Sequence, residues 1–210
     1  MCSVVGYVGN KHSSEYILQG LSRLEYRGYD SAGFACIDTR LQTIEVVKAV
    51  GQLEILRTKL QQNPFDGTVG LGHTRWATHG KATEQNAHPH LDCTETAVIV
   101  HNGIIENHHE LRSALLVQNH TFLSETDTEV IAHLFEQYLS TSLSIQEAFS
   151  KTIQQLQGAY ACILLSQENP DMLLVARKGS PLCIGKGDGE MFVSSDPLAF
   201  VGRAQSVFFL

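Results

Sequence analysis

The order in which strand-like and helix-like apolar patterns follow one another most constrains how this chain can fold. Runs typical of strands occur at 2–8, 32–37, 43–50, 68–74, 97–100, 159–165, 172–176, 182–185, 191–193 and from 207 onward. Helical spacing of apolar residues occurs at 17–24, 53–60, 111–115, 127–139 and 148–156. Helices grouped between two sets of strands predict sheets packed face to face and covered by helices, because each element must bury its apolar face.

Two of the predicted helices begin with a recognisable capping pattern. Thr126 with Glu129, and Ser144 with Glu147, both have the spacing of a capping box, in which the first side chain bonds the third helical amide. The first box places Asp127 in the opening turn of the helix that runs to about residue 139.

The chain has 210 residues, 43% of them hydrophobic, and no repeat or linker, which predicts one domain over 1–210. A formal charge of −7 with scattered basic residues argues against a nucleic-acid partner. The apolar runs are too short to span a bilayer, and residues 1–6 lack the basic start of a signal peptide. We therefore expect a cytoplasmic protein with no membrane contact. Because the sequence stops on the apolar run 207–210, we expect a C-terminally truncated fragment.

The five cysteines are odd in number and dispersed, which argues against a disulfide framework. Three of them, Cys36, Cys162 and Cys183, lie in apolar runs and are expected to be buried. Cys2 differs because it follows Met1 and is small enough for that methionine to be removed. One residue would then carry both a thiol and an α-amine. The amine titrates near 7.7–8.0, so it can accept the thiol's proton without a separate histidine.

Three polar segments offer complementary chemistry, and each also has a plain structural interpretation. Arg75 could clamp a carboxylate through two hydrogen bonds, or form a surface salt bridge. Asn102 and the Gly103 N–H could form an oxyanion hole, or an ordinary Asn-Gly turn. Asp127 could bind an ammonium group, or support a helix terminus. Together, a carboxylate clamp, an ammonium ligand, a thiol and an oxyanion hole describe a site for glutamine.

Several strings carry a resemblance to a known family: Met1-Cys2, EYRGYDSAG at 25–33, HTRWATHG at 73–80, HPH at 88–90, HNGIIEN at 101–107, and the segments 124–133, 158–160, 179–182 and 195–196. The chain resembles the N-terminal-nucleophile (class II) glutamine amidotransferases over essentially its whole length. Within them it is most similar to the glutaminase domains of glucosamine-6-phosphate synthases. The strings at 26–30 and 73–76 separate this branch from relatives that aminate phosphoribosyl pyrophosphate or aspartate.

The resemblance implies an α+β fold, a four-layer α/β/β/α sandwich of two mostly antiparallel sheets known as the N-terminal nucleophile hydrolase fold. It implies that Cys2 is the nucleophile, and that Asn102 and the Gly103 N–H form the oxyanion hole. It further implies that Arg75 holds the carboxylate of glutamine and that Asp127 holds its ammonium group.

Further residues take their expected roles from the same resemblance. Thr78 and His79 belong to a glutamine-binding loop that closes over the substrate, and Arg27 lies near the nucleophile. Trp76, also counted among the substrate-binding residues, gates the passage of ammonia to a second domain. Ser3 stands where family members usually have glycine, and its β-carbon is expected to restrict the backbone or narrow the pocket.

The resemblance also implies which molecules this chain meets. The substrate is L-glutamine, and neither a metal nor another cofactor is expected. Fructose 6-phosphate would be reached only through sugar isomerase domains that this sequence lacks, in an enzyme that opens hexosamine synthesis and is a homodimer when full length. The chain alone should release ammonia without making glucosamine 6-phosphate.

Three other functions stay open at this point. A metallohydrolase could use the histidines near the proposed site, although neither H-E-x-x-H nor paired C-x-x-C spacing is present; those histidines are His73, His79, His88, His90, His101, His108 and His109. A regulatory glutamine-binding module could result if Ser3 or a retained Met1 disables the nucleophile. A related amidase could act on another amide, although Arg75 and Asp127 together favour an amino acid.

Overall fold

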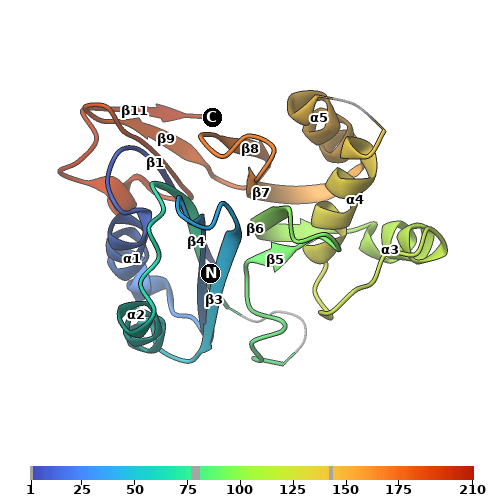
Figure 1. Ribbon diagram of the computed structural model, residues 1–210, viewed down its shortest axis with the longest axis horizontal. Helices are drawn as coiled ribbons and strands as arrows, with labels where there is room; N and C mark the ends of the chain where they lie inside the picture. Colours follow the sequence, from blue (N-terminus) through green and yellow to red (C-terminus); the bar gives the residue numbers. More distant parts are fainter. Residues whose placement is uncertain (1, 77–80, 142–143) are drawn as a thin grey trace.

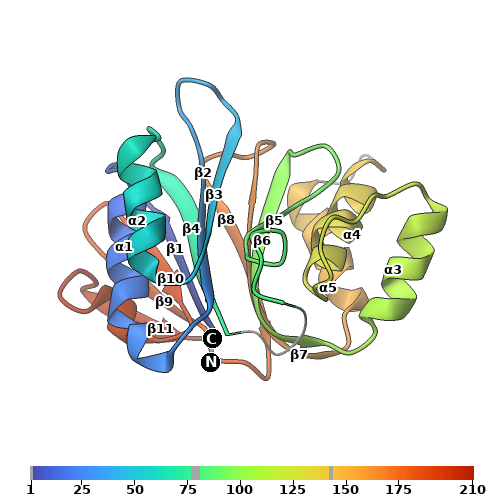
Figure 2. The ribbon, with the colours of Figure 1, turned by 90° about the horizontal axis from the view of Figure 1, so that it is seen from below.

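Two sheets face each other in the middle of the molecule, and helices cover the outer face of each (Figure 1). This computed structural model describes residues 2–76, 81–141 and 144–210. The arrangement is the four-layer α/β/β/α sandwich that was predicted. Figure 2 shows the layers edge-on, with α1 and α2 on one side and α3, α4 and α5 on the other.

Within the described ranges, one sheet has seven strands in the order β11-β9-β10-β1-β4-β2-β3, and all of its neighbours are antiparallel. Its strands are β1 (Ser3–Val8), β2 (Ser31–Ile37), β3 (Ile44–Val50), β4 (Val69–Arg75), β9 (Cys183–Lys186), β10 (Met191–Ser194) and β11 (Ser206–Phe209). At the centre, Ser3 of β1 pairs with Thr74 of β4. This register brings Cys2 beside the residues that end β4.

The other sheet has four strands in the described ranges, in the order β5-β6-β7-β8. They are β5 (His90–Leu91), β6 (Ala97–Ile105), β7 (Gly158–Ser166) and β8 (Leu173–Lys178). The strand expected to end at residue 100 continues, because Asn102 and Gly103 pair with Ala161 and Tyr160 of β7. The alternative of an Asn-Gly turn is therefore wrong.

Gly103 makes this continuation possible. Its φ is +125°, and a β-carbon there would lie 2.0 Å from the carbonyl oxygen of Ala159. Only glycine fits such a close approach of two strands.

Three apolar layers separate the four structural layers. One lies between the seven-stranded sheet and the helices α1 (Ser13–Arg23) and α2 (Leu53–Gln62). Another lies between the two sheets, and alternation along β1 sends Val4 into it and Val5 toward the helices. The last lies between the four-stranded sheet and α3 (His108–Val117), α4 (Glu129–Leu139) and α5 (Ile145–Gln155). Short 3-10 turns occupy Glu25–Arg27 and Pro197–Phe200.

One of the two expected capping boxes forms. Ser144 and Glu147 make both reciprocal bonds at the start of α5. The box predicted for Thr126 and Glu129 is wrong, because α4 begins at Glu129 itself. The Glu129 carboxylate instead accepts hydrogen bonds from the amides of residues 123 and 124. Asp127 consequently lies just before α4 and not in its first turn.

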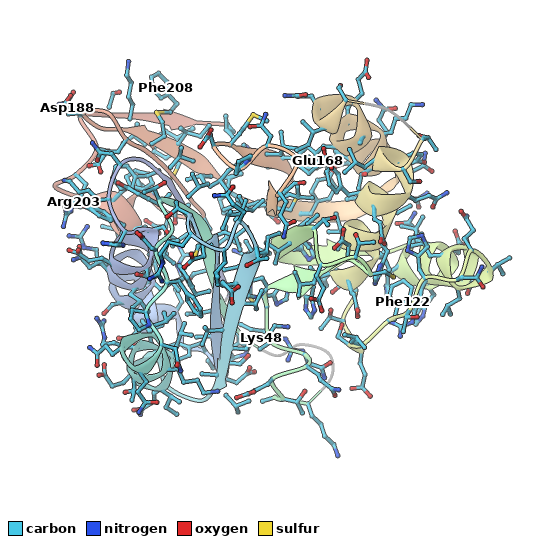
Figure 3. The ribbon with its side chains drawn as sticks, in the orientation of Figure 1. Lys48, Phe122, Glu168, Asp188, Arg203 and Phe208 are labelled. Carbon is cyan, nitrogen blue, oxygen red and sulfur yellow. The ribbon has the colours of Figure 1, made fainter. Side chains whose placement is uncertain are left out.

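The cysteines and surface side chains complete the description. Cys36, Cys162 and Cys183 are buried, as expected, and all five cysteines, each within the described ranges, are free thiols. Figure 3 shows Phe208 of β11 at the outer edge of the seven-stranded sheet and Phe122 beside α3. Among the described residues, none of the helices has the length and apolar character needed to cross a bilayer.

Candidate active site

The Cys2 thiol lies just before the first residue of β1, beside the last residues of β4. Its Sγ accepts the Trp76 N–H at 3.2 Å and lies 3.6 Å from the Trp76 carbonyl oxygen. Burial raises the pKa of the Cys2 thiol, while the Trp76 amide and the Arg75 charge lower it. The net rise keeps the sulfur protonated at neutral pH, so a base is needed to activate it.

Asn102 approaches Cys2 from the opposite sheet. Its Nδ2 donates to the Cys2 carbonyl oxygen at 3.2 Å, and its Oδ1 lies 3.0 Å from Nε2 of His73. The same Nε2 lies 3.0 Å from the carbonyl oxygen of His101. Because both oxygens can only accept, this nitrogen must carry the hydrogen. Burial lowers the pKa of His73 to about 3, so the ring is a neutral donor at neutral pH.

His73 thereby fixes the orientation of the Asn102 amide, a role that the sequence analysis missed. The sequence signal was its place in the string at 73–80, where it was considered only as a metal ligand. Its effect depends on a contact between β4 and β6, which belong to different sheets. Spacing along the chain does not predict that contact.

One pocket is lined by both of the charged residues expected to bind an amino acid. Cys2, Arg75, Trp76, Gly103 and Asp127 all line it, together with His88, His101, Thr126 and Thr128. The pocket lies between the end of β4 and the segment that precedes α4. A thiol, a cation and an anion therefore face one cavity.

Protein contacts position both charged groups in the pocket. Arg75 is only 5% exposed, and its Nη1 donates to the Lys81 carbonyl oxygen at 3.3 Å. Asp127 Oδ2 accepts the N–H of Ile105, the last residue of β6, at 2.8 Å. The aspartate is therefore tied to the same strand that carries the candidate oxyanion hole.

Buried histidines support the segment that carries Asp127. His88 Nε2 and His101 Nδ1 both bond the hydroxyl of Thr128, at 2.8 and 2.9 Å. His90 Nε2 bonds the hydroxyl of Thr126 at 3.1 Å. Burial lowers the pKa of all three histidines, so they are neutral hydrogen-bonding groups at neutral pH.

This network argues against the metallohydrolase interpretation. The rings of His73 and His88 stack with centroids 4.0 Å apart, and the rings of His108 and His109, at the start of α3, contact each other in a tilted arrangement. Among the described residues, the one group of ligand atoms close enough for a metal ion contains none of the histidines proposed for that function. His79 lies outside the described residues.

A groove adjoins the pocket and shares Cys2, Trp76 and Gly103 with it. Cys2, Arg27, Trp76, Asn102 and Gly103 line it, with Ile104, Ser180, Pro181 and Ser195. Arg27, which forms an ion pair with Asp196, therefore shares this groove with Cys2.

Trp76 and Ser3 also have defined positions. Trp76 is 51% exposed, and its indole lies against Gly28, where a β-carbon would be 2.2 Å from a ring atom. Ser3 is buried within β1, has no left-handed φ and lines neither cavity, so its side chain does not narrow the pocket. Its Oγ has no hydrogen-bond partner among the described residues. Thr78 and His79 lie outside those residues.

Similarity to known proteins shows which family this chain belongs to. A family model described as a glutamine amidotransferase domain matches residues 73–202, more than half of the chain. The chain belongs to this family. It is 48% identical over 211 residues to the glutamine–fructose-6-phosphate aminotransferase (isomerizing) of Pyrococcus horikoshii, covering 100% of this chain and 35% of that protein. It is 47% identical over 210 residues to the enzyme of that name from Escherichia coli O6:H1, covering 100% and 34%.

The amidotransferase domain thus spans about a third of the length of these relatives. Solved structures support the same fold. The glutamine phosphoribosylpyrophosphate amidotransferase of B. subtilis, solved with ADP and GMP, superposes with a TM-score of 0.82 at 26% identity, covering 100% of this chain and 44% of that one. An allosteric regulatory enzyme of purine biosynthesis superposes with a TM-score of 0.83, also at 26% identity, with the same coverage. The fold is the N-terminal nucleophile hydrolase fold.

Proposed function

We propose that this amidotransferase domain hydrolyses the side-chain amide of L-glutamine to glutamate and ammonia, with Cys2 as the nucleophile. The observation that carries the proposal is the single pocket lined by the Cys2 thiol, Arg75 and Asp127. An arginine for a carboxylate and an aspartate for an ammonium group match the two charged ends of a free amino acid.

The first step needs a base for a thiol whose pKa is raised by burial. Once Met1 is removed, the α-amine of Cys2 has the ordinary pKa of an N-terminus, about 7.7–8.0, and accepts the thiol's proton. The sulfur then attacks the side-chain carbonyl carbon of glutamine. The amine passes the proton to the departing nitrogen, which leaves as ammonia, and a thioester remains. Water hydrolyses the thioester and restores the thiol.

Charge that develops on the carbonyl oxygen is stabilised by Asn102 and Gly103. The Asn102 Nδ2 has two hydrogens, of which one bonds the Cys2 carbonyl oxygen. The second can point to the oxyanion together with the Gly103 N–H. Because His73 already orients the amide, this donor pays little reorganisation cost when the charge forms.

A mass-spectrometric experiment tests the nucleophile. The 210-residue chain is treated with a glutamine-like diazoketone, and its intact mass and peptides are measured. We expect loss of Met1 and one label on Cys2, and the Cys2→Ala variant should be unlabelled and inactive as a glutaminase. Cys183→Ala, which removes a buried thiol away from the pocket, should label like the wild type. A protein that retains Met1 and still hydrolyses glutamine at full rate would contradict the proposal.

We further propose that the ammonia serves a longer enzyme. The relatives named glutamine–fructose-6-phosphate aminotransferase are about three times as long, which supports transfer to fructose 6-phosphate on sugar isomerase domains outside this chain. With glutamine and fructose 6-phosphate present, the chain alone should release ammonia and form no glucosamine 6-phosphate. In that setting Trp76 would gate ammonia passage, Thr78 and His79 would close over glutamine, and the full-length enzyme would be a homodimer. A cytoplasmic location stays a prediction.

The assay for ammonia release also tests the alternative of a regulatory module without catalysis. Glutamine binding without ammonia release would favour it. The position of Ser3 inside β1, away from the pocket lining, supports an active nucleophile.

A further inference from the structure

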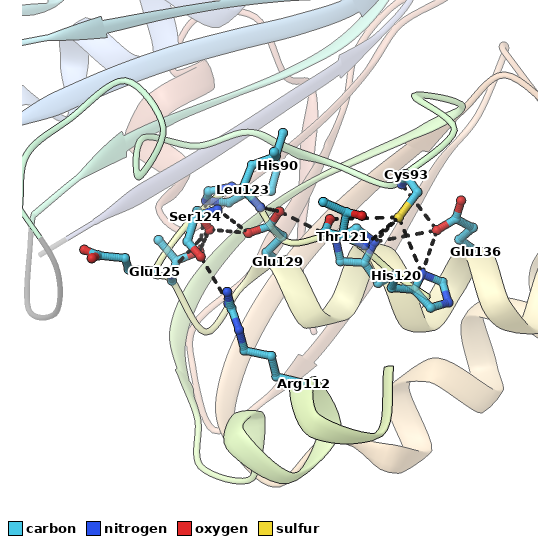
Figure 4. A network of polar contacts seen from close by, with 12 residues as sticks. His90, Cys93, Arg112, His120, Thr121, Leu123, Ser124, Glu125, Glu129 and Glu136 are labelled. Atoms are coloured by element: carbon cyan, nitrogen blue, oxygen red, sulfur yellow. Dashed lines mark hydrogen bonds and ion pairs between the residues drawn. The ribbon is translucent and has the colours of Figure 1, made fainter. Parts of the chain in front are cut away.

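Four side chains with metal-binding atoms converge on the helix-covered side of the four-stranded sheet (Figure 4). Cys93 follows β5, His120 follows α3, and His133 and Glu136 lie on α4. One ligand atom from each lies within 4.8 Å of all the others. None of the four lines the pocket that contains Cys2.

The distances between these atoms fit a tetrahedral ion. With zinc bonds of about 2.3 Å to sulfur and about 2.0–2.2 Å to nitrogen and oxygen, tetrahedral ligands lie about 3.6 Å apart for sulfur–nitrogen pairs and about 3.4 Å for nitrogen–oxygen pairs. Cys93 Sγ lies 3.7 Å from Nδ1 of His120 and 3.4 Å from Nδ1 of His133. Glu136 Oε2 lies 3.0 and 3.6 Å from the same two nitrogens. The four distances bracket the tetrahedral values.

The surrounding groups also match those around a bound metal. His133 is 1% exposed, and its other ring nitrogen, Nε2, lies 3.5 Å from Glu129 Oε1 without forming a hydrogen bond. A carboxylate behind a histidine is the usual outer partner of a metal-binding imidazole. The Thr121 N–H donates to Cys93 Sγ at 3.3 Å, and the Cys93 N–H donates to Glu136 Oε2 at 3.3 Å. These bonds hold the sulfur and the carboxylate oxygen in place.

We propose that Cys93, His120, His133 and Glu136 form a structural zinc site. A thiolate with two imidazoles selects zinc over the harder cations magnesium and calcium. One thiolate and one carboxylate neutralise the double charge of the ion. Four protein ligands leave no open position, so the ion is structural and takes no part in amide hydrolysis. Cys93 is exposed, which gives the ion a route into the site.

The ion would link the segment that leads to Asp127, a residue of the pocket lining, to the rest of the domain. It would join the end of β5, the loop after α3, and α4 at one point. Glu129, behind His133, accepts the amides of Leu123 and Ser124 at 2.7 Å and the Ser124 hydroxyl at 2.6 Å (Figure 4). The order of the segment leading to Asp127 therefore depends on the same carboxylate that supports the metal ligand.

Direct metal binding tests the site without reference to activity. The 210-residue chain is first stripped of metal with a chelator. It is then titrated with zinc in the presence of a chromophoric competitor, and separately with cobalt while the absorption spectrum is recorded. The Cys2→Ala background removes the thiol in the pocket and makes the result independent of the glutaminase proposal. We expect one equivalent of each metal, and a thiolate-to-cobalt charge-transfer band with the visible bands of a tetrahedral ion.

Matched variants assign the ligands. Cys93→Ser and His120→Ala should weaken zinc binding by more than the roughly 10–100-fold expected for loss of an outer partner, which Glu129→Gln should show. His109→Ala removes an exposed α3 histidine outside the cluster and should bind like the wild type. Zinc should raise the thermal unfolding midpoint of the parent and not of Cys93→Ser. Less than half an equivalent bound at micromolar zinc, or a charge-transfer band that survives in Cys93→Ser, would overturn the proposal.

Discussion

His73 Nε2 lies 3.0 Å from Asn102 Oδ1, so a buried neutral histidine of one sheet holds the amide that faces Cys2 from the other. The same nitrogen also contacts the His101 carbonyl oxygen, which leaves one tautomer able to satisfy both acceptors. The contact crosses the layer between the sheets, so the position of the Asn102 amide depends on how the two sheets pack together.

Replacing His73 with phenylalanine keeps a ring in the core and removes the donor. We expect kcat to fall by roughly 10², with a smaller change in KM, because a misplaced Asn102 amide stabilises the transition state poorly. His73→Gln, which can still donate, should recover part of the loss. Steady-state kinetics on folded variants, verified by circular dichroism, measure the effect. An unchanged kcat in His73→Phe would show that the amide needs no such support.

Removing the Asn102 amide tests the oxyanion hole itself. Asn102→Ala should lower kcat by roughly 10²–10³, the usual cost of losing one oxyanion donor. Glutamine titrations give kcat and KM separately. If only KM rises, Asn102 binds the substrate and does not stabilise the intermediate.

Asp127→Asn removes a charge and keeps the shape of the side chain. We expect weaker glutamine binding with a smaller change in kcat, because the lost contact with the ammonium group acts in both ground and transition states. Selectivity for glutamine over glutaramic acid, which lacks the α-amine, should disappear. Competition assays with the two compounds measure this. Selectivity retained by the variant would assign ammonium recognition to another group.

The buried histidines make stability depend on pH. Burial lowers the pKa of His88 and His90 well below the ordinary value of about 6.5, so both are neutral when folded. Below that pH the unfolded chain binds more protons than the folded chain, and the free energy of unfolding falls as the pH drops. Each histidine should lower the free energy of unfolding by up to about 1.4 kcal/mol for each pH unit below the ordinary pKa.

Urea unfolding at pH 7 and pH 5.5 measures this loss. His88→Asn should lower stability at pH 7 and also reduce its dependence on pH, because one of the protonating groups is gone. The interpretation fails if His88→Asn and the parent lose the same free energy between the two pH values.

Local patterns were enough to predict the layers of this fold. Helical spacing placed Leu53, Leu56 and Leu60 on one face of α2, and all three are buried beneath it. The Ser144–Glu147 box formed because both of its partners lie within one turn. Such features depend on neighbours in the sequence and can be found there.

Features decided by distant partners were missed. Asn102 and Gly103 continue β6 because β7, more than fifty residues later, provides a pairing strand. A nearby alternative was missed as well, because the Glu129 carboxylate accepts the amides of residues 123 and 124 instead of forming the expected capping box. Arg75 and Asp127 could be named from their chemistry. The cluster around Cys93 could not, since its ligands span 93 to 136 with no short spacing.

The pairing of Ser3 with Thr74 limits where the chain can tolerate insertions and deletions. Successive residues of a strand point to opposite faces, so a single residue inserted into β4 before Thr74 would turn Arg75 away from the cavity while Cys2 stayed in place. Insertions and deletions should therefore be tolerated in the loops that flank β4 and not within the strand, whose alignment with β1 sets the distance between Cys2 and Arg75.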